Sequence, residues 1–273
     1  KKAKEIIDPV VASSSADEQT FQVASAIENT LGNTGKAKRV LKDGLSKFPN
    51  SGLLYNSQGN VFLRDKDNKS ALEAYRKGIV AEPSYHMNYY NASKIYFQND
   101  DAVWALLYGE IYVNLEPTSM RASEIKKMMI DAYRKLFSPG KGDELPKFKA
   151  ANTSTGASLQ DFDGVFKSLM TQNASAISDG LNTENLIMLR TRFMLAYMRN
   201  YSINLPFTLF SYQDKMLHDG VYDAYNQWLF GAVENAQEFS LWIKTNSKSY
   251  SDFERWRTSN LLQPANYDPK PSK

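Results

Sequence analysis

Three prolines recur at a fixed spacing in the first half of the chain: Pro49, Pro83 and Pro117 stand 34 residues apart. Proline disfavours helical geometry in the residue before it and cannot donate the next backbone hydrogen bond, so each proline is expected to end a helix. Three more columns share this register: an aromatic residue at Phe21, Tyr55 and Tyr89, a small residue at Ser25, Gly59 and Ser93, and alanine at Ala37, Ala71 and Ala105. A period of this length predicts stacked helical hairpins.

The small columns have a geometric role in such a stack. Two antiparallel helices approach closely only where a small residue on one faces a larger residue on the other, so that ridges fit into grooves. Polar clusters at residues 32–35, 65–69 and 98–101 recur near the same period. These clusters are expected to form the turn inside each hairpin.

Residues from about 17 to 118 resemble the tetratricopeptide repeat family on these columns. The second copy fits best, with Tyr55, Gly59, Phe62, Ala71, Tyr75, Gly78 and Pro83. The first copy departs from the pattern at Glu28, and the third departs at Gly109 and Tyr112. The resemblance implies an all-α, right-handed helical-hairpin solenoid of three repeats, at residues 17–50, 51–84 and 85–118, which binds a peptide or protein on its concave face.

The remaining chain also has helical periodicity. Residues 1–16 are interpreted as an N-terminal extension, 119–150 as a capping helix and linker, 151–263 as a compact, aromatic-rich helical domain with a repeat-like hairpin, and 264–273 as a tail. Helices are expected at 124–137, 159–171, 183–199, 206–217, 222–233, 236–245 and 251–259, and a flexible linker at 150–158. The aromatic residues after position 206 favour a packed core over an aromatic peptide-binding pocket.

The concave face would be lined by the first helix of each pair. Its candidate partner-binding residues are Asn56, Asn60, Arg64, Tyr90, Lys94, Phe97 and Arg121. Such side chains can hydrogen-bond the backbone or the carboxylate of an extended peptide. Family members that grip a C-terminal carboxylate use Lys, Asn and Arg on this face; Asn60 and Arg121 match two of these positions, whereas Tyr90 and Ile125 occupy others. Ordinary exposed side chains, or a groove partly filled by the C-terminal helices, remain alternatives.

No motif in the sequence indicates a metal or cofactor site. The two histidines, His86 and His218, cannot alone make the usual histidine-rich metal site, and the absence of cysteine excludes disulfides and thiolate ligands. Residues 65–68 begin like a calcium loop, but Ser70 and Arg76 replace its glycine and its final acid. We therefore expect no catalytic residue, no cofactor and no metal.

Two other classes of function stay open beside a non-enzymatic scaffold. An enzyme would use carboxylates such as Asp161, Asp163 or Glu184 at the seam between the two halves, although Asp161 and Asp163 point in different directions if both lie on a helix. A structural protein would use the repeats to self-assemble. The identity of the partner and the oligomeric state are not predicted.

Charge and hydropathy limit the classes of partner that the chain is expected to bind. The net charge is +3. Residues 1–150 contain 22 basic and 18 acidic residues, and residues 151–273 contain 11 basic and 12 acidic residues. This balance does not indicate the clustered basic face of a nucleic-acid-binding protein. No apolar run reaches the roughly 18–20 residues of a membrane span. No signal-like segment is present, but the chain begins at Lys1, so a removed leader stays open. Abundant Tyr, Asn and Ser without Cys favour a periplasmic or cell-envelope bacterial protein.

Overall fold

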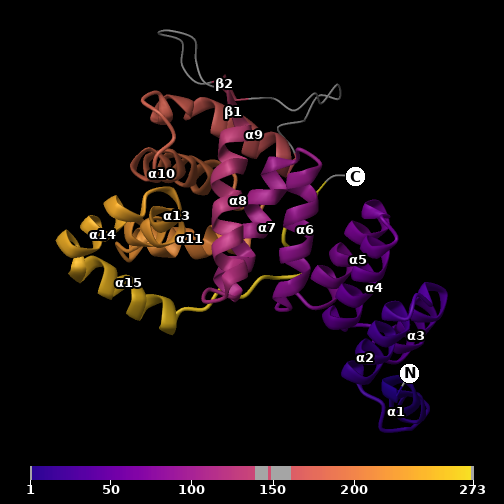
Figure 1. Cartoon of the computed structure of the whole chain (residues 1–273). Coiled ribbons are helices and arrows are strands. Elements are labelled where there is room, and N and C mark those ends of the chain that lie inside the picture. The colour runs from indigo at the N-terminus through magenta and orange to yellow at the C-terminus, as the bar shows by residue number, and fades with distance from the viewer. Residues whose placement is uncertain (1, 139–146, 149–160, 272–273) are drawn as a thin grey trace. The chain divides into compact units, whose positions relative to one another are not determined.

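The computed structural model describes residues 2–138, 147–148 and 161–271 (Figure 1). The fold is all-helical apart from a two-residue antiparallel ladder between β1 (Phe137–Ser138) and β2 (Lys147–Phe148). The chain forms two compact units, Lys1–Ile95 with Ala265–Tyr267 and Tyr96–Pro264 with Asp268–Lys273. The expected linker at 150–158 lies outside the described residues.

The helix boundaries of the N-terminal unit follow the period of the sequence. This unit contains α1 (Lys2–Val11), α2 (Glu18–Thr30), α3 (Thr34–Lys47), α4 (Gly52–Arg64), α5 (Asn68–Ala81) and most of α6 (His86–Gln98). Glu18, Gly52 and His86 begin α2, α4 and α6 at intervals of 34 residues. Both α3 and α5 end two residues before the next proline, as the sequence predicts. Residues 1–16, interpreted as an extension, contain α1, which packs on α2.

The small columns lie where helices approach most closely. A Cβ atom added at Gly59 of α4 would lie 2.3 Å from Cε1 of Tyr75 on α5, and one added at Gly44 of α3 would lie 2.8 Å from Cγ of Phe21 on α2. Ala37 and Ala71 have no exposed surface. The predicted packing role of these columns is confirmed, because any larger side chain would push the paired helices apart.

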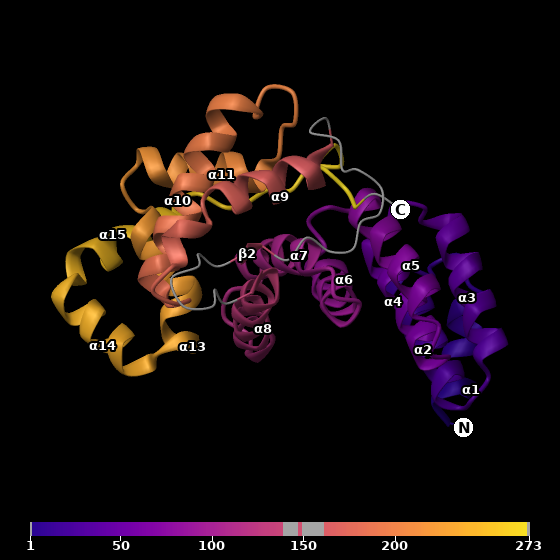
Figure 2. The same ribbon diagram turned by 90° about the horizontal axis from the view of Figure 1, so that it is seen from above.

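The C-terminal unit is built around α7 (Ala102–Leu115) and α8 (Met120–Leu136), which pack on each other. It continues through α9 (Phe162–Gln172), α10 (Thr183–Asn200), α11 (Thr208–His218), α12 (Tyr222–Asn226), α13 (Ala232–Glu234), α14 (Ala236–Thr245) and α15 (Ser247–Ser259). A π-helical turn at Gln227–Gly231 interrupts the helix expected at 222–233. Figures 1 and 2 show α14 and α15 together at one edge of this unit.

The division between the units falls inside α6, whereas the sequence analysis places it near residue 150. The reason lies in α7, whose residues from Ala102 to Val113 are all buried. A helix that is apolar on every side needs neighbours all round. Those neighbours include the later helices: Trp104 of α7, for example, packs against Phe162 of α9 with ring centroids 5.6 Å apart.

Aromatic side chains fill the core of the C-terminal unit. Phe162, Phe193, Tyr197 and Phe210 are buried, and their ring centroids lie 4.7–6.2 Å apart in several stacked and edge-to-face pairs. Such pairs add to the stabilisation from buried area. Of the aromatic residues after position 206, Phe210 lies in this core, and Phe207, Tyr222, Tyr225 and Phe230 are buried as well, so the preference for core packing over a peptide-binding pocket is confirmed for these five rings.

The segment expected to be a tail is tied to this core at Asp268, which is buried. The backbone N–H of Thr208 donates to Oδ1 of Asp268 over 2.9 Å, and the Thr208 hydroxyl donates to Oδ2. Because Phe207 at the start of α11 offers no capping side chain, Asp268 supplies the cap from 60 residues away.

Candidate functional site

Four asparagines form a continuous row across α4 and α6, which we call the amide row: Asn56, Asn60, Asn88 and Asn91. Asn88 donates to the carbonyl oxygen of Gly52 over 3.0 Å, and Asn56 donates to Oδ1 of Asn88 over 3.2 Å. Asn60 donates to Oδ1 of Asn56 over 3.3 Å, and its own Oδ1 lies 3.5 Å from Nδ2 of Asn91. The row therefore runs from the interior of the unit outward.

The two ends of the amide row differ in exposure. Asn56 and Asn88 are 5% and 0% exposed, whereas Asn60 is exposed and Asn91 is half-buried. The hydroxyl of Tyr75 donates to Oδ1 of Asn60 over 2.8 Å and holds that oxygen in place. A carboxamide has two N–H donors and two acceptor lone pairs. Oδ1 of Asn60 already accepts from Tyr75 and Asn91, so Asn60 keeps one N–H donor for a ligand, whereas Asn91 keeps one N–H and its Oδ1.

Room for the amide row comes from a glycine of α5. A Cβ atom at Gly78 of α5 would lie 2.3 Å from Nδ2 of Asn88. Gly78 therefore lets the buried Asn88 reach the backbone of α4.

Cationic side chains flank the row. Arg64 is exposed and lies one turn after Asn60 on α4. On α6, Nζ of Lys94 lies 5.0 Å from the ring centroid of Tyr90 and donates to its hydroxyl over 3.2 Å. The N-terminal unit thus brings together five of the seven candidate residues from the sequence, in two groups: Asn56, Asn60 and Arg64 on α4, and Tyr90 and Lys94 on α6.

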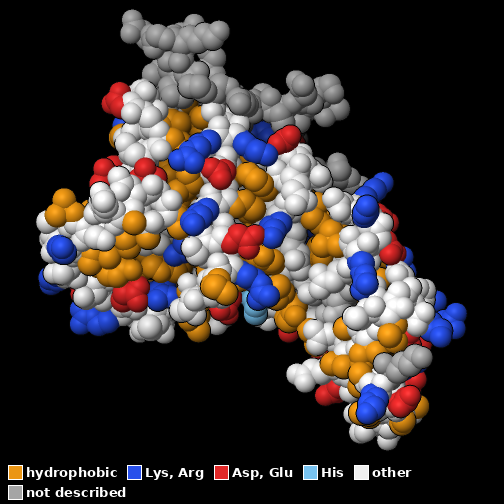
Figure 3. Space-filling model, in the orientation of Figure 1, with side chains coloured by type: hydrophobic (Ala, Val, Ile, Leu, Met, Phe, Trp, Pro, Cys, Tyr) orange, Lys and Arg blue, Asp and Glu red, His pale blue; other side chains and the backbone are white. Residues whose placement is uncertain are grey.

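Phe97 and Arg121 belong to the C-terminal unit. The ring of Phe97 faces the ammonium group of Lys135, 4.1 Å from its centroid, and Lys135 also pairs with Asp100. Arg121 is exposed in the first turn of α8. Lys and Arg side chains are interspersed with Asp and Glu on the face shown in Figure 3, in agreement with the small net charge.

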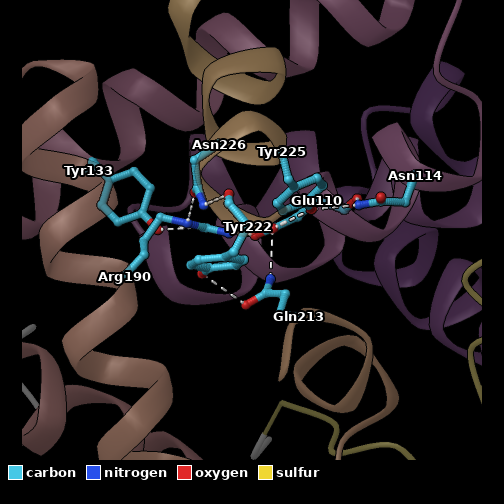
Figure 4. Close-up of polar contacts among 8 residues, drawn as sticks. All are labelled: Glu110, Asn114, Tyr133, Arg190, Gln213, Tyr222, Tyr225 and Asn226. Carbon is cyan, nitrogen blue, oxygen red and sulfur yellow. Dashed lines mark hydrogen bonds and ion pairs between the residues drawn. The ribbon is translucent and has the colours of Figure 1, made fainter. Parts of the chain in front are cut away.

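A buried polar cluster in the C-terminal unit was not predicted from the sequence (Figure 4). It is centred on an ion pair between Glu110 of α7 and Arg190 of α10, which are 3% and 4% exposed. Nη1 of Arg190 donates to Oε2 of Glu110 over 3.0 Å, while Nη2 donates to Oε1 over 2.5 Å. This bidentate geometry is the strong form of a guanidinium–carboxylate contact.

Further polar groups complete this network. Arg190 donates from Nε to Oδ1 of Asn226 over 2.6 Å and from Nη1 to the hydroxyl of Tyr133 over 2.9 Å. Gln213 and Tyr225 donate to Oε1 of Glu110 over 2.7 and 2.6 Å. Burial, followed by the negative charge of Glu110, raises the pKa of the Tyr225 phenol, so it stays protonated and can donate.

The buried network is closed to substrates. The cavity beside it has a volume of about 10 Å³ and includes apolar walls from Leu106, Phe166 and Phe193. That space suits one water molecule at most. The network links α7, α8, α10, α11 and α12 through side-chain hydrogen bonds. Its signal in the sequence was Glu110 itself, a lone acid in an otherwise apolar helix, because a buried charge needs a partner.

The carboxylates that an enzyme would use each have a structural contact. Asp161 caps α9 by accepting from the N–H of Gly164 over 2.7 Å, and Asp163 accepts from Nε1 of Trp104 over 2.9 Å. Burial raises the pKa of Asp163. Glu184 accepts from Nε2 of Gln227 over 2.6 Å.

The residues that resembled metal ligands also have local contacts. Asp67 accepts from the N–H of Ser70 over 3.0 Å and so caps α5. Nδ1 of His218 lies 2.9 Å from the carbonyl oxygen of Asp214, one turn back on the same helix, and His86 stacks on Tyr85. Within the described residues, no three His, Asp or Glu side chains are arranged to hold a metal ion.

One lysine has an unusual environment. Lys126 of α8 donates to the carbonyl oxygen of Trp228 over 2.8 Å, and its Nζ lies 3.7 Å from the centroid of that indole. Burial and, secondarily, the positive charge of Arg257 lower the pKa of Lys126 to about 7. This amine therefore titrates near neutral pH, well below an ordinary lysine.

No family model matches the chain, and no curated protein matches it. In the described part of the chain, no helix is both long enough and apolar enough to cross a membrane.

Proposed function

We propose that this protein is a non-enzymatic interaction scaffold of the tetratricopeptide type, which binds an extended peptide segment of a partner protein along α4 and α6. The observation that carries the proposal is the amide row, which ends in exposed Asn60 and half-buried Asn91. The 34-residue recurrence of the helix starts and the close approaches at Gly44 and Gly59 support the solenoid part of it.

An extended peptide has unpaired N–H and C=O groups along both edges. Carboxamide side chains can donate to the one and accept from the other, so they bind peptide backbone with little regard to sequence. Hydrogen bonds to Tyr75 and Asn56, over 2.8 and 3.3 Å, fix the orientation of the Asn60 carboxamide. A side chain that is already ordered loses less entropy on binding.

The charges beside the amide row select the kind of peptide. Arg64 is exposed one turn beyond Asn60. A guanidinium at this position favours a segment that carries an acidic side chain or a C-terminal carboxylate. Half-buried Leu53 and Met87, on the same two helices, offer apolar surface for its side chains.

The test is to select peptides from a displayed library against the purified chain and to measure the best binder by fluorescence anisotropy. Asn60→Ala and Asn91→Ala are each expected to weaken binding about 3- to 10-fold, the loss of one or two net hydrogen bonds. Asn200→Ala is the matched control, because Asn200 is exposed in the other unit and bonds to its own helix.

Thermal unfolding of each variant checks that the helices stay intact. Equal peptide affinity in Asn60→Ala, Asn91→Ala and Asn200→Ala would overturn the proposal.

A further inference from the structure

A second polar cavity lies in the C-terminal unit, among α10, the π-helical turn, α13 and α14. Its volume is about 80 Å³, and its lining includes the carboxylates of Glu184, Glu234 and Glu238 and the rings of Phe239 and Trp242. This is room for several water molecules or for the head group of a small ligand. We infer that this acidic cavity binds an organic cation with N–H donors, of the alkylammonium or guanidinium class.

The charge of the acidic cavity has one sign. Three carboxylates line it, and no lysine or arginine does. None of the three carboxylates forms an ion pair with a described residue, although many surface carboxylates of this protein do, such as Glu73 with Lys77. A cation is therefore the complement that the cavity lacks.

Helix ends explain part of this charge but not all of it. Glu184 and Glu238 lie in the first turns of α10 and α14, where a carboxylate is stabilised by the positive end of the helix dipole. Glu234 is the last residue of a helical segment that runs from Tyr222 through the π-helical turn and α13, and the helix dipole does not stabilise a carboxylate at that C-terminal end. Its carboxylate accepts from the hydroxyl of Thr183 over 3.2 Å. The dipoles therefore do not account for the third negative charge.

A buried glutamine with an unused acceptor oxygen gives independent evidence for a ligand. Gln227 lines the cavity and is 3% exposed. Its Nε2 donates to Oε1 of Glu184 over 2.6 Å, and because a carboxylate only accepts, this contact fixes which end of the amide is nitrogen. Oε1 of Gln227 accepts from no described residue. This oxygen keeps some accessible surface, so it can accept from the N–H of a ligand in the cavity.

The backbone around Gln227 is shaped for the acidic cavity. The π-helical turn from Gln227 to Gly231 places both of its end residues on the cavity wall, and such turns occur often at functional sites. A Cβ atom at Gly231 would lie 2.5 Å from Cδ2 of Phe239 and 2.8 Å from Oε1 of Gln227. The glycine therefore lets the Phe239 ring and the unpaired oxygen share one wall.

The aromatic rings complete the recognition chemistry. Phe239 and Trp242 are half-buried, and both pack edge-on against Tyr250, with centroids 6.0 and 6.4 Å from its ring. Fixed aromatic faces attract ammonium and guanidinium groups. Carboxylates, an amide oxygen and ring faces together fit a cation that has both N–H donors and an apolar surface.

The experiment titrates the intact chain with n-butylguanidinium, n-butylammonium and tetramethylammonium while the indole N–H signals are followed by NMR. Trp242→Phe assigns the Trp242 signal. The first two cations are expected to shift this signal saturably, and tetramethylammonium, which has no N–H, at least fivefold more weakly. Glu234→Gln should weaken the binding of butylguanidinium at least threefold. Glu73→Gln, the same change at an exposed position of α5, should leave this binding unchanged.

The source of the cation is read from a second pair of probes. A blocked glycine–arginine–glycine tripeptide that binds as well as butylguanidinium supports a partner side chain, and a tripeptide that fails while butylguanidinium binds supports a free small molecule. No saturable shift with any N–H cation up to about 50 mM would overturn the inference, since a millimolar Kd would be saturated there. So would equal affinity for tetramethylammonium, or equal affinity in Glu234→Gln and the wild type.

Discussion

Arg190→Met tests the structural role of the buried network directly. The substitution keeps most of the apolar stem but removes a guanidinium that makes hydrogen bonds to Glu110, Tyr133 and Asn226. Glu110 would keep its donors Gln213 and Tyr225 but lose its counter-charge. Breaking a buried ion pair from one side costs about 3–5 kcal/mol, because the remaining charge stays buried and uncompensated.

The assay is urea unfolding followed by circular dichroism, together with thermal unfolding. For a unit of this size, that loss corresponds to a Tm lowered by roughly 6–20 °C. Arg134→Met is the matched control, since Arg134 pairs with Asp131 on the surface of α8 and its side chain is 57% exposed. The control should stay within about 0.5 kcal/mol of the wild type.

A double-mutant cycle separates the ion pair from simple loss of packing. Glu110→Gln removes the charge on the other side, and the double variant should be more stable than the sum of the single effects by about 1–3 kcal/mol. If Arg190→Met costs no more than Arg134→Met, or if the two single effects add, the network does not hold these helices together in the way we describe.

Two further predictions follow from packing and burial. Gly59→Ala should destabilise the N-terminal unit by about 1–3 kcal/mol in urea unfolding, because its Cβ would meet the buried Tyr75 ring. Gly35→Ala is the control and should be neutral or stabilising, because nothing lies within 4 Å of its Cβ. The reverse order of the two stabilities would refute the close approach. Burial lowers the pKa of Lys126 to about 7 from its ordinary 10.5, so the unfolded state binds more protons than the folded state between these two pH values. The free energy of unfolding of the wild type, measured relative to Lys126→Met, should therefore rise from pH 6 to pH 10. A difference that stays constant with pH would refute the shift.

The helices were largely predictable because their signals are local. Hydrophobic periodicity, prolines and polar turns act within one or two helical turns, and the expected helices at 183–199 and 236–245 match α10 (Thr183–Asn200) and α14 (Ala236–Thr245). The π-helical turn at Gln227–Gly231 was not predicted, since nothing in its residues distinguishes it from an ordinary helical turn.

The candidate sites were predictable only in part. Asn56 and Asn60 were placed on a common face from their spacing, but the sequence did not show that Asn88 and Asn91 continue the row from α6. The acidic cavity joins residues from position 183 to position 242, so no local pattern could reveal it. Of its carboxylates, Glu184 alone was singled out, and for an enzyme site that we do not propose.

The sequence by itself determined the 34-residue period, the ends of the helices and the small residues at which paired helices meet, because these depend on backbone geometry and on neighbours close in the chain. Tertiary structure alone decided which charges meet. Glu110 and Arg190 are 80 residues apart and share one bidentate contact, and Gln227 reaches Glu184 across 43 residues. Such pairings are set by how whole helices pack in three dimensions. A charged residue in an apolar helix indicates that a partner is needed, but the sequence does not identify that partner.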